Sequence, residues 1–380
     1  MDVVGIVTEY NPFHNGHLYQ VNEVKKRFPD AVIIVVMSGN FLERGEPAIL
    51  DKWTRAREAI LNGVNLVVEL PVAFCVQPAD FFAFGALRIL KELGVQKLVF
   101  GAENEEYNFA EMAEITKRVH GNFSTYNESY AKAYQRAITE KTGVDVSKPN
   151  NLLGLAYARA NLKLGSFLEL VPIQRRAAAH HDQQLPITSR IASASAIRDA
   201  ALNRQESVAN YVPHLTAVDL QQGKTLSWVD FWPLLKYQIL TSNVQELREI
   251  YGMTEGLEFR IKDKLERMGP AVTFNDWISE VKSKRFTYTH MTRIATMILL
   301  QAKNEDIEEV EQKPYIRILG FDIKGQNHLN SVKKKLLFPV VSRVSQKVAA
   351  NLLKLDYRAG LVYSQFSGQR QDFGRSPFQQ

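Results

Sequence analysis

Two patterns of apolar and polar positions divide the chain near residue 205. In the first part, five short and almost wholly apolar runs alternate with longer amphipathic segments. Such runs are typical of strands that are buried on both faces of a parallel sheet. The predicted strands are Val3–Val7, Ala31–Met37, Val64–Val68, Lys97–Phe100 and Phe167–Pro172. This alternation predicts an α/β fold with an open parallel sheet, right-handed crossovers and ligands at the carboxyl ends of the strands.

The pattern changes in the second part. Segments such as "FWPLLKYQILTS" and "MTRIATMILLQA" are helical in period, and a single strand is predicted within "YIRILGFDI". The final stretch, "SGQRQDFGRSPFQQ", is polar and aperiodic, which is typical of a disordered end. The sequence therefore predicts a catalytic α/β domain over residues 1–205, a mainly helical domain over residues 206–365 and a disordered tail over residues 366–380.

Composition limits the class of protein. Of the 380 residues, 45% are apolar, enough for a substantial core. No uninterrupted apolar run approaches the roughly 18 residues of a membrane span. The start, "MDVVGIV", lacks the basic and long apolar regions of a secretory signal. With one cysteine, Cys75, an internal disulfide is excluded. We expect a cytoplasmic protein without membrane contact.

The excess positive charge lies entirely in the second part. Residues 1–200 carry 22 basic and 22 acidic side chains, whereas residues 201–380 carry 25 and 19, for a net charge of +6. A basic half beside a neutral half is consistent with a polyanionic partner. Charge that only aids solubility is the alternative, and composition leaves both open.

The stretch "GIVTEYNPFHNGHL", Gly5 to Leu18, carries the first candidate chemistry. It predicts a first strand, a turn and the start of a helix, where unpaired N–H groups and the helix dipole favour an anion. His14 and His17 fall on one helix face and could donate hydrogen bonds to phosphoryl oxygens. Gly16 would let a phosphate approach the backbone. A metal site would need a third ligand and a different histidine spacing, so we predict none. Surface or capping histidines are the alternative to phosphate contact.

Two short motifs resemble the signatures of the nucleotidyltransferase superfamily, which has a Rossmann-like fold. "HNGH" is similar to the HxGH signature, and "IASASAIR", Ile191 to Arg198, is similar to the ISSTxIR signature. The resemblance implies phosphate contacts from Ser193, Ser195 and Arg198. Ala194 stands where the signature has a second serine, which leaves one hydroxyl fewer. Taken alone, this serine-rich stretch would more readily be interpreted as a helix N-cap.

Longer strings resemble the bacterial tRNA(Met) cytidine acetate ligase family. They include "MSGNFLERGEPAILDKWTRAREAILNGVNLVVELP", "FGAENEE", "KPNNLLGLAYARA" and "VPIQRR". Glu43 departs from the glutamine expected in this family. The resemblance implies that ATP activates acetate as acetyl-adenylate with release of pyrophosphate. The acetyl group then passes to N4 of the wobble cytidine of elongator tRNA(Met), giving N4-acetylcytidine.

The resemblance also implies site residues. His14 and His17 would be catalytic, as pyrophosphate contacts. The implied ATP-binding residues are Val7, Thr8, Glu9, Tyr10, Asn11, Pro12, Phe13, His14, Asn15, Gly16, His17, Leu18, Tyr19, Gln20, Gly101, Asn150, Asn151, Arg175 and Arg176. Asn150 is favoured over Asn151 without excluding it. Mg²⁺ on the phosphates is plausible for adenylyl transfer, but no motif identifies its protein ligands.

Other positions remain open. Asn40 and Arg44 could line the acetate or nucleotide pocket or support the turn, and we favour structural roles for Asp51 and Lys52. The candidate tRNA contacts, which could also be solvated charges, are Lys282, Lys284, Arg285, Lys333, Lys334 and Lys335. Two other functions stay open, a small-molecule adenylyltransferase and a catalytically inactive, ATP-sensing RNA-binding module.

Overall fold

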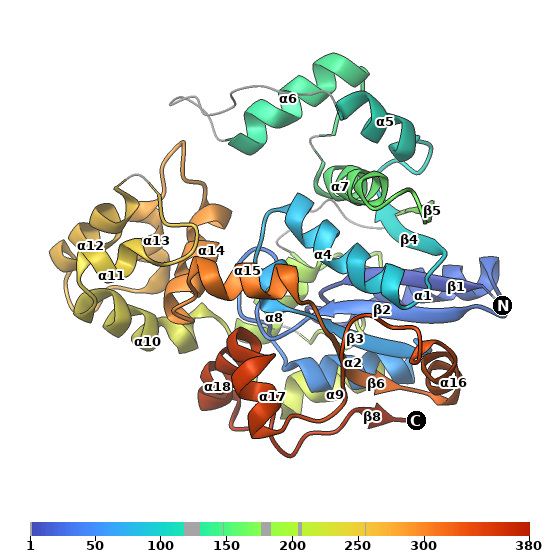
Figure 1. The fold of residues 1–380 in the computed structure, drawn as a ribbon. Helices are drawn as coiled ribbons and strands as arrows, with labels where there is room; N and C mark the ends of the chain where they lie inside the picture. The colour runs from blue at the N-terminus through green and yellow to red at the C-terminus, as the bar shows by residue number, and fades with distance from the viewer. Residues whose placement is uncertain (1, 118–129, 147, 176–183, 204–206, 255) are drawn as a thin grey trace.

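A mostly parallel sheet lies at the centre of the protein. The structure is a computed structural model, and it describes all residues except 1, 118–129, 147, 176–183, 204–206 and 255 (Figure 1). In these described residues, the sheet has the order β5-β4-β1-β2-β3-β6-β7, with β8 paired to β6. The strands are β1 (Val3–Thr8), β2 (Val32–Ser38), β3 (Leu66–Leu70), β4 (Lys97–Ala102), β5 (Glu169–Gln174), β6 (Ile316–Phe321), β7 (Val340–Val341) and β8 (Phe378–Gln379). The expected α/β fold and its five strands are confirmed, with small shifts at the strand ends.

The order of the sheet reverses beside β1. This strand pairs in parallel with β2 on one side and with β4 on the other, and β5 continues in parallel beyond β4. A crevice forms at such a reversal, outside the carboxyl ends of the two central strands, because the connections leave to opposite faces. The ends of β1, β4 and β5 therefore meet at the expected binding edge.

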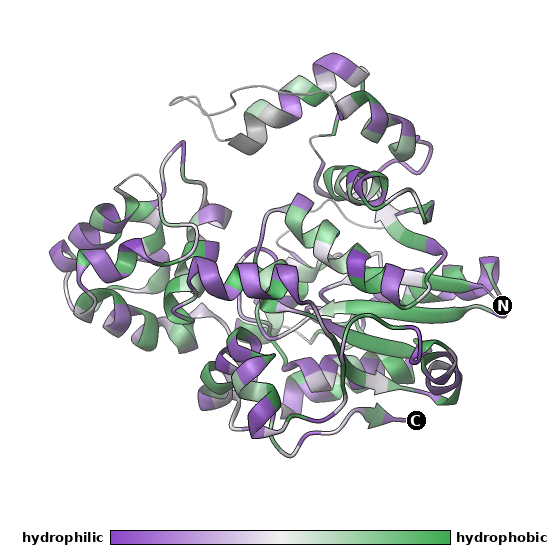
Figure 2. Cartoon of the chain, viewed as in Figure 1, coloured by the Kyte–Doolittle hydropathy of each residue, from purple (hydrophilic) through white to green (hydrophobic). Residues whose placement is uncertain are grey.

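Helices cover both faces of the sheet, because successive strand residues point to opposite sides. Ile34 and Val36 of β2 join one core cluster with α4, whereas Ile33 and Val35 join another with α1 and α2. The helices of this part are α1 (Asn15–Arg27), α2 (Lys52–Leu61), α3 (Val72–Cys75), α4 (Ala79–Glu92), α5 (Phe109–Thr116), α6 (Tyr130–Thr142), α7 (Pro149–Lys163) and α8 (Ala194–Asn203). Figure 2 shows that the central strands are hydrophobic and that the outer helices carry both hydrophobic and hydrophilic residues.

A group of helices lies beyond the carboxyl ends of the strands (Figure 1). The helices of this group are α10 (Trp228–Thr241), α11 (Val244–Arg248), α12 (Leu257–Arg267), α13 (Phe274–Val281), α14 (Tyr288–Leu299) and α15 (Asn304–Gln312). The preceding helix, α9 (His214–Gln222), instead contacts α2. Aromatic rings fill its centre, where Trp228 stacks on Phe274 at 4.5 Å between centroids. Among the described residues, no helix is long and apolar enough to cross a membrane.

The chain returns to the sheet after α15. β6 pairs antiparallel with β3, and it is followed by α16 (Ile323–Val332), α17 (Gln346–Asn351) and α18 (Lys354–Ser367). α18 contacts α3 of the first part. The sequence places β6 within the mainly helical domain over residues 206–365, whereas in the structure this strand extends the sheet of the first part. The helical period of these segments gave no sign that the one predicted strand pairs with β3.

Residues 366–380, which the sequence predicts to be a disordered tail, pack against the sheet in the structure. Gln371 and Asp372 are buried, and β8 pairs with β6. The indole Nε1 of Trp53 donates to the Gln371 carbonyl at 2.9 Å, and Arg317 forms an ion pair with Asp372 at 2.6 Å. Polar contacts hold the end of the chain in place. Because such contacts do not require regularly spaced apolar residues, the sequence pattern does not indicate them.

Candidate active site

The loop after β1 brings two histidines to the start of α1. His14 is the N-cap, and its Nδ1 accepts a hydrogen bond from the Gly16 N–H at 3.0 Å. The Nδ1 of His17 accepts in turn from the His14 N–H at 3.3 Å. The two rings stack with their centroids 3.7 Å apart. Since each Nδ1 is an acceptor, each neutral ring carries its proton on Nε2.

Both histidines are neutral at physiological pH. The pKa of His14 is lowered to about 3, first by burial and then by the charges of Arg175 and Arg198. The pKa of His17 is lowered well below its usual value by burial, then by His14 and Arg175. The two rings can therefore act as neutral hydrogen-bond donors, while the two arginines supply the positive charge. This combination is suited to a polyphosphate.

Gly16 keeps His14 in place. A Cβ atom at Gly16 would lie 2.8 Å from Cε1 of His14, too close for any side chain. His17 is supported from below by Tyr10, with ring centroids 4.8 Å apart, and Tyr10 packs against Phe13 at 4.7 Å. Tyr10 and Phe13 are fully buried. Within the loop implied to bind ATP, these two buried side chains therefore pack against His17 and support it.

The second motif lies next to the first. The Asn15 side chain donates to the carbonyls of Arg190 and Asn210, at 2.8 and 2.9 Å. Arg198, on α8, donates to the Asn11 carbonyl at 3.1 Å, and its other terminal nitrogen lies 3.6 Å from Glu46. The two motifs, which are far apart in the sequence, thus share one edge of the sheet.

The serines of the second motif surround the start of α8. Ser193 is buried and its Oγ accepts from the Ala196 N–H at 3.1 Å, so the N-cap interpretation of this stretch is confirmed. The hydroxyls of Ser193 and Ser195 lie 3.0 Å apart. A capping role leaves a phosphate role open, because both use the same helix N-terminus.

The ends of β4 and β5 supply the other side of the crevice. Gly101 lies against Arg175, since a Cβ atom there would be 3.2 Å from Cγ of the arginine. Burial lowers the pKa of Arg175, while the charge of Glu103 opposes this effect. Arg175 therefore presents a partly desolvated cation beside the histidines. Arg176 lies outside the described residues.

The two asparagines of "PNN" have different surroundings. Asn151 is buried, and its Oδ1 accepts from the N–H groups of Glu103 and Asn104, at 3.0 and 3.3 Å. Asn150 is less buried, and its Nδ2 donates to Glu103 Oε1 at 2.6 Å. Asn151 thus fixes the turn after β4, and Asn150 is the asparagine nearer the surface.

Comparison with known proteins agrees with this arrangement. The family described as HIGH Nucleotidyl Transferase matches residues 1–375. The tRNA(Met) cytidine acetate ligase of Ligilactobacillus salivarius is 46% identical over 379 residues, which cover 99% of both chains. That of Limosilactobacillus reuteri is 41% identical, with the same coverage. The chain belongs to the tRNA(Met) cytidine acetate ligase family.

Solved structures extend this comparison to the fold. The apo crystal structure of TmcAL from Thermotoga maritima has a TM-score of 0.89 and 30% identity, and it covers 100% of this chain and 99% of that one. A second crystal form of that protein, bound with alpha-thio ATP, has a TM-score of 0.87 at the same identity and coverage. The whole fold, including the C-terminal return to the sheet, is therefore shared with that member of the family.

Sequence reasoning missed Arg55, which joins the ends of β1 and β2. It is fully buried, and its guanidinium donates to the carbonyls of Glu9, Ser38 and Gly39, while Nε donates to Leu50. An arginine of an amphipathic helix is normally exposed, so its sequence position carries no sign of this role.

The loop after β2 contacts the helical group. Thr296 Oγ1 donates to the Gly45 carbonyl at 2.6 Å, and Thr292 Oγ1 donates to the Arg44 carbonyl. Arg293 Nε donates to the Glu43 carbonyl at 2.8 Å, and its Nη2 contacts the Glu43 carboxylate. α14 is thereby attached directly to the loop that borders the crevice.

The polar residues beside this loop have structural roles. Asp51 caps α2 through the Trp53 N–H at 2.9 Å, and Lys52 forms a buried ion pair with Glu69 at 2.9 Å, as expected. Asn40 is buried and accepts from the Lys52 N–H at 3.0 Å. Arg44 is exposed at the rim of the crevice.

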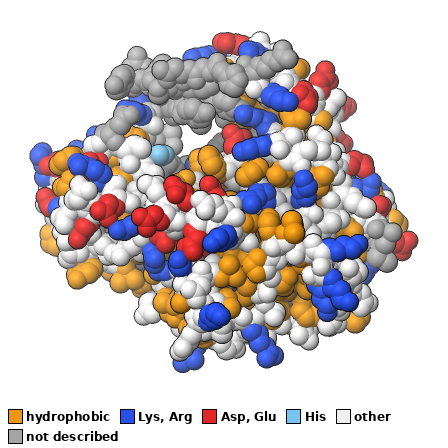
Figure 3. Space-filling view, viewed as in Figure 1, with side chains coloured by type: hydrophobic (Ala, Val, Ile, Leu, Met, Phe, Trp, Pro, Cys, Tyr) orange, Lys and Arg blue, Asp and Glu red, His pale blue; other side chains and the backbone are white. Residues whose placement is uncertain are grey.

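The two basic clusters lie at opposite ends of the sheet. The loop between α13 and α14, in the group of helices beyond the carboxyl ends of the strands, carries Lys282, Lys284 and Arg285 (Figure 1). Lys333–Lys335 follow α16, which lies at the end of the sheet near the N-terminus (Figure 1). Figure 3 shows basic and acidic side chains intermixed on the viewed face. The first cluster therefore lies on the side of the helical group, and the second lies at the other end of the sheet.

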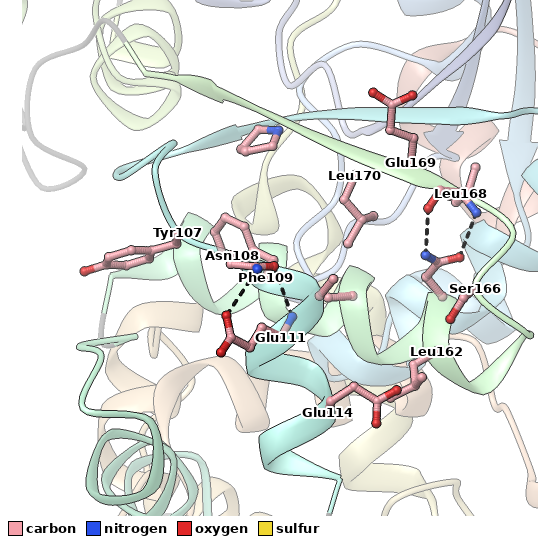
Figure 4. A pocket seen from close by; sticks show the side chains of 14 residues that line it. Tyr107, Asn108, Phe109, Glu111, Glu114, Leu162, Ser166, Leu168, Glu169 and Leu170 are labelled. Carbon is pink, nitrogen blue, oxygen red and sulfur yellow. Dashed lines mark hydrogen bonds between the residues drawn. The ribbon is translucent and has the colours of Figure 1, made fainter.

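A separate cavity lies outside this site. It has a volume of about 510 Å³ between α5, α7 and β5 (Figure 4). Its wall carries Glu111, Glu114 and Glu169, a charge that disfavours phosphates. The polar side chains of Asn108 and Asn161 there are already bonded, to Glu111 and to the backbone of Leu168. This cavity therefore adds no ligand group to the crevice.

Proposed function

We propose that this protein is an ATP-dependent ligase that acetylates N4 of the wobble cytidine of elongator tRNA(Met). Acetate and ATP first form acetyl-adenylate and pyrophosphate, and acetyl transfer to the tRNA then releases AMP. The observation that carries this proposal is the meeting of both phosphate motifs around two neutral histidines at the reversal of the sheet. The names of full-length relatives support the choice of acetate and tRNA(Met).

In the first step, the triphosphate lies over the start of α1. The Nε2–H groups of His14 and His17 donate to the departing pyrophosphate, and Arg175 and Arg198 balance its charge. Acetate attacks the α-phosphorus in line from the opposite side. Since the protein forms no covalent bond in this step, the rate depends on positioning and charge stabilisation.

ATP is the nucleotide we assign, and Mg²⁺ is a proposed companion of its phosphates. The groups around the crevice are mainly neutral imidazoles and guanidiniums, and among the described residues no group of three or more potential ligands could hold a metal ion. Mg²⁺ commonly keeps several waters and binds through substrate phosphates, so it fits this site without a protein cage. When bound, it would neutralise phosphate charge.

In the second step, the tRNA contacts the helical group. The wobble base must leave its stack to reach the crevice. Lys282, Lys284 and Arg285 are the proposed backbone contacts on that side, and Lys333–Lys335 would need a tRNA that extends past the sheet. Because tRNA and ATP are substrates, the cytoplasm is the proposed location.

A product assay separates this function from the two alternatives. The protein is incubated with ATP, labelled acetate and total tRNA, and the RNA is digested to nucleosides. Label in N4-acetylcytidine supports the ligase, whereas AMP transfer to a small phosphate ester supports a small-molecule adenylyltransferase. Binding of tRNA with neither product supports the inactive module. The tRNA affinity should also fall steeply with salt, because phosphate contacts release counterions.

A further inference from the structure

Glu9 lies at the junction of the phosphate site and the loop that carries the helical group. It directly follows β1 and precedes Tyr10, which supports His17. Its Oε1 accepts a hydrogen bond from the Glu43 N–H at 2.8 Å, so the carboxylate is held at a fixed position. Arg293 of α14 holds Glu43 from the other side. Glu9 thus links the loop that carries the first phosphate motif to the loop that α14 contacts.

One oxygen of Glu9 remains available. The side chain is only half-buried, and within the described part of the chain no donor is bonded to Oε2. The other carboxylates nearby are occupied. Glu43 contacts Arg293, Glu46 faces Arg198 and Asp51 caps α2. Glu9 is therefore the carboxylate at this edge with a fixed position and an open oxygen.

The surroundings also favour proton uptake by Glu9. Burial, and then the charge of Glu43, raises its pKa, while the Glu43 N–H and Arg44 act in the opposite direction and Glu46 raises it further. Cys75 of α3, Tyr157 of α7 and Arg55 of α2 face it from the helices packed around it. A carboxylate with a raised pKa is a stronger base than an ordinary glutamate.

The histidines cannot take this part. Their Nδ1 atoms accept backbone N–H groups, and the pKa of His14 is only about 3. A neutral imidazole of such low basicity does not hold a proton from an amine. The proton acceptor of the second step must therefore be a different group.

We infer that Glu9 is the general base of acetyl transfer. The N4 lone pair of cytidine attacks the acyl carbon of acetyl-adenylate, and the N4 proton passes to Glu9 Oε2. The bond between the acyl carbon and the phosphate oxygen then breaks, and AMP leaves with that electron pair. The products are N4-acetylcytidine, AMP and protonated Glu9, which returns its proton to water. This inference rests on the proposed function.

The test separates the two half-reactions in a Glu9→Gln variant. Glutamine keeps an acceptor for the Glu43 N–H but cannot take up a proton. Acetate-dependent exchange of pyrophosphate into ATP, without tRNA, reports the first step. Transfer from enzyme-bound acetyl-adenylate to tRNA, in a single turnover, reports the second. We expect transfer to fall about 100-fold or more, and exchange to fall far less.

Controls distinguish the possible failures. Glu106→Gln changes an exposed carboxylate after β4, and both of its half-reactions should match the unmodified protein. Transfer by the unmodified protein should decline as the pH falls through the raised pKa of Glu9, and this decline should vanish in Glu9→Gln. Equal losses in both half-reactions, or unchanged transfer with the same pH profile, would overturn the inference. If the unmodified protein forms no acetyl-adenylate, the proposed function itself fails.

Discussion

At the scale of single residues, the site depends on keeping two histidines neutral. An imidazolium pair would bind phosphate in the ground state, but burial and two arginines prevent protonation. The stacked rings instead present fixed neutral donors. In the proposed function, their role is directional stabilisation of the leaving pyrophosphate, with the charge supplied by Arg175 and Arg198.

Neutral burial of His14 predicts acid sensitivity. Its pKa is about 3 in the folded protein, against about 6.5 when unfolded. Between these values the unfolded chain binds more protons, so the free energy of unfolding falls as pH decreases, by about 1.4 kcal/mol per pH unit. The free energy of unfolding is measured by urea titration at pH 7 and at pH 5. Between these two pH values, we expect it to fall by about 2 kcal/mol more in the unmodified protein than in His14→Asn. Asparagine retains the N-cap. Equal losses would contradict the neutral assignment.

Gly16→Ala tests the placement of His14. The added Cβ would lie 2.8 Å from the imidazole, so the ring must move. We expect acetate-dependent pyrophosphate exchange to fall about 10-fold or more, because a displaced donor loses its contact in the transition state. Gly269→Ala is the matched control, since a Cβ there meets nothing within 4 Å. An unchanged rate of pyrophosphate exchange in Gly16→Ala would exclude the proposed hydrogen bond from His14 to the pyrophosphate.

At the scale of elements, α14 and the loop after β2 act as one unit. Two threonine hydroxyls of the helix bond to the loop carbonyls of Arg44 and Gly45, and a Cβ at Gly45 would lie 2.4 Å from the Arg293 backbone nitrogen. So close an approach leaves the loop no independent position. The helical group therefore sets the geometry beside Glu9.

Removing both hydroxyls tests this attachment. The double variant Thr292→Val and Thr296→Val leaves two carbonyls without their partners, at a cost of about 1 kcal/mol each. We expect a lower melting temperature, and acetyl transfer to tRNA reduced more than pyrophosphate exchange. Thr241→Val, which removes a bond within α10 alone, is the control. Equal loss in the two half-reactions would argue against a link between α14 and the transfer step.

The elements differ in how well the sequence predicts them. The first four strands are recognisable because each is a mainly buried apolar run, whereas β5 is a half-buried strand of mixed polarity at the edge of the sheet. Both phosphate motifs are recognisable by spacing. The pairing of β6 with β3 cannot be predicted in this way, because an apolar run does not indicate which strand it pairs with. Arg55 and the open oxygen of Glu9 were missed for a similar reason. Their roles depend on carbonyls and N–H groups that only the fold brings together.

At the scale of the whole molecule, a buried ion-pair network attaches the C-terminal segment to the sheet. Lys52, Glu69, Arg317 and Asp372 form a buried network, with Lys52 and Arg317 each within 3.6 Å of both carboxylates. The network joins α2, β3 and β6 to residues near the end of the chain. Since it holds Gln371, which bonds to Asn40, it also supports the loop after β2.

Asp372→Asn tests the contribution of this ion-pair network to stability. Two buried cations would then share one carboxylate, and breaking a buried ion pair in this way costs about 3–5 kcal/mol. We expect a loss of that order in the free energy of unfolding by urea. Asp30→Asn, at an exposed position, should change it little. A variant as stable as the unmodified protein would show that the ion pairs of Asp372 do not stabilise the fold.

The central claim, that acetate is activated here for the wobble cytidine, is tested most directly with two tRNA transcripts. One is elongator tRNA(Met), and the other carries uridine in place of the wobble cytidine. Each is incubated with the protein, ATP and labelled acetate, and the nucleosides are separated. The account predicts label in N4-acetylcytidine from the first transcript and none from the second. Label in both transcripts, or in neither while the protein is folded and binds ATP, would contradict it.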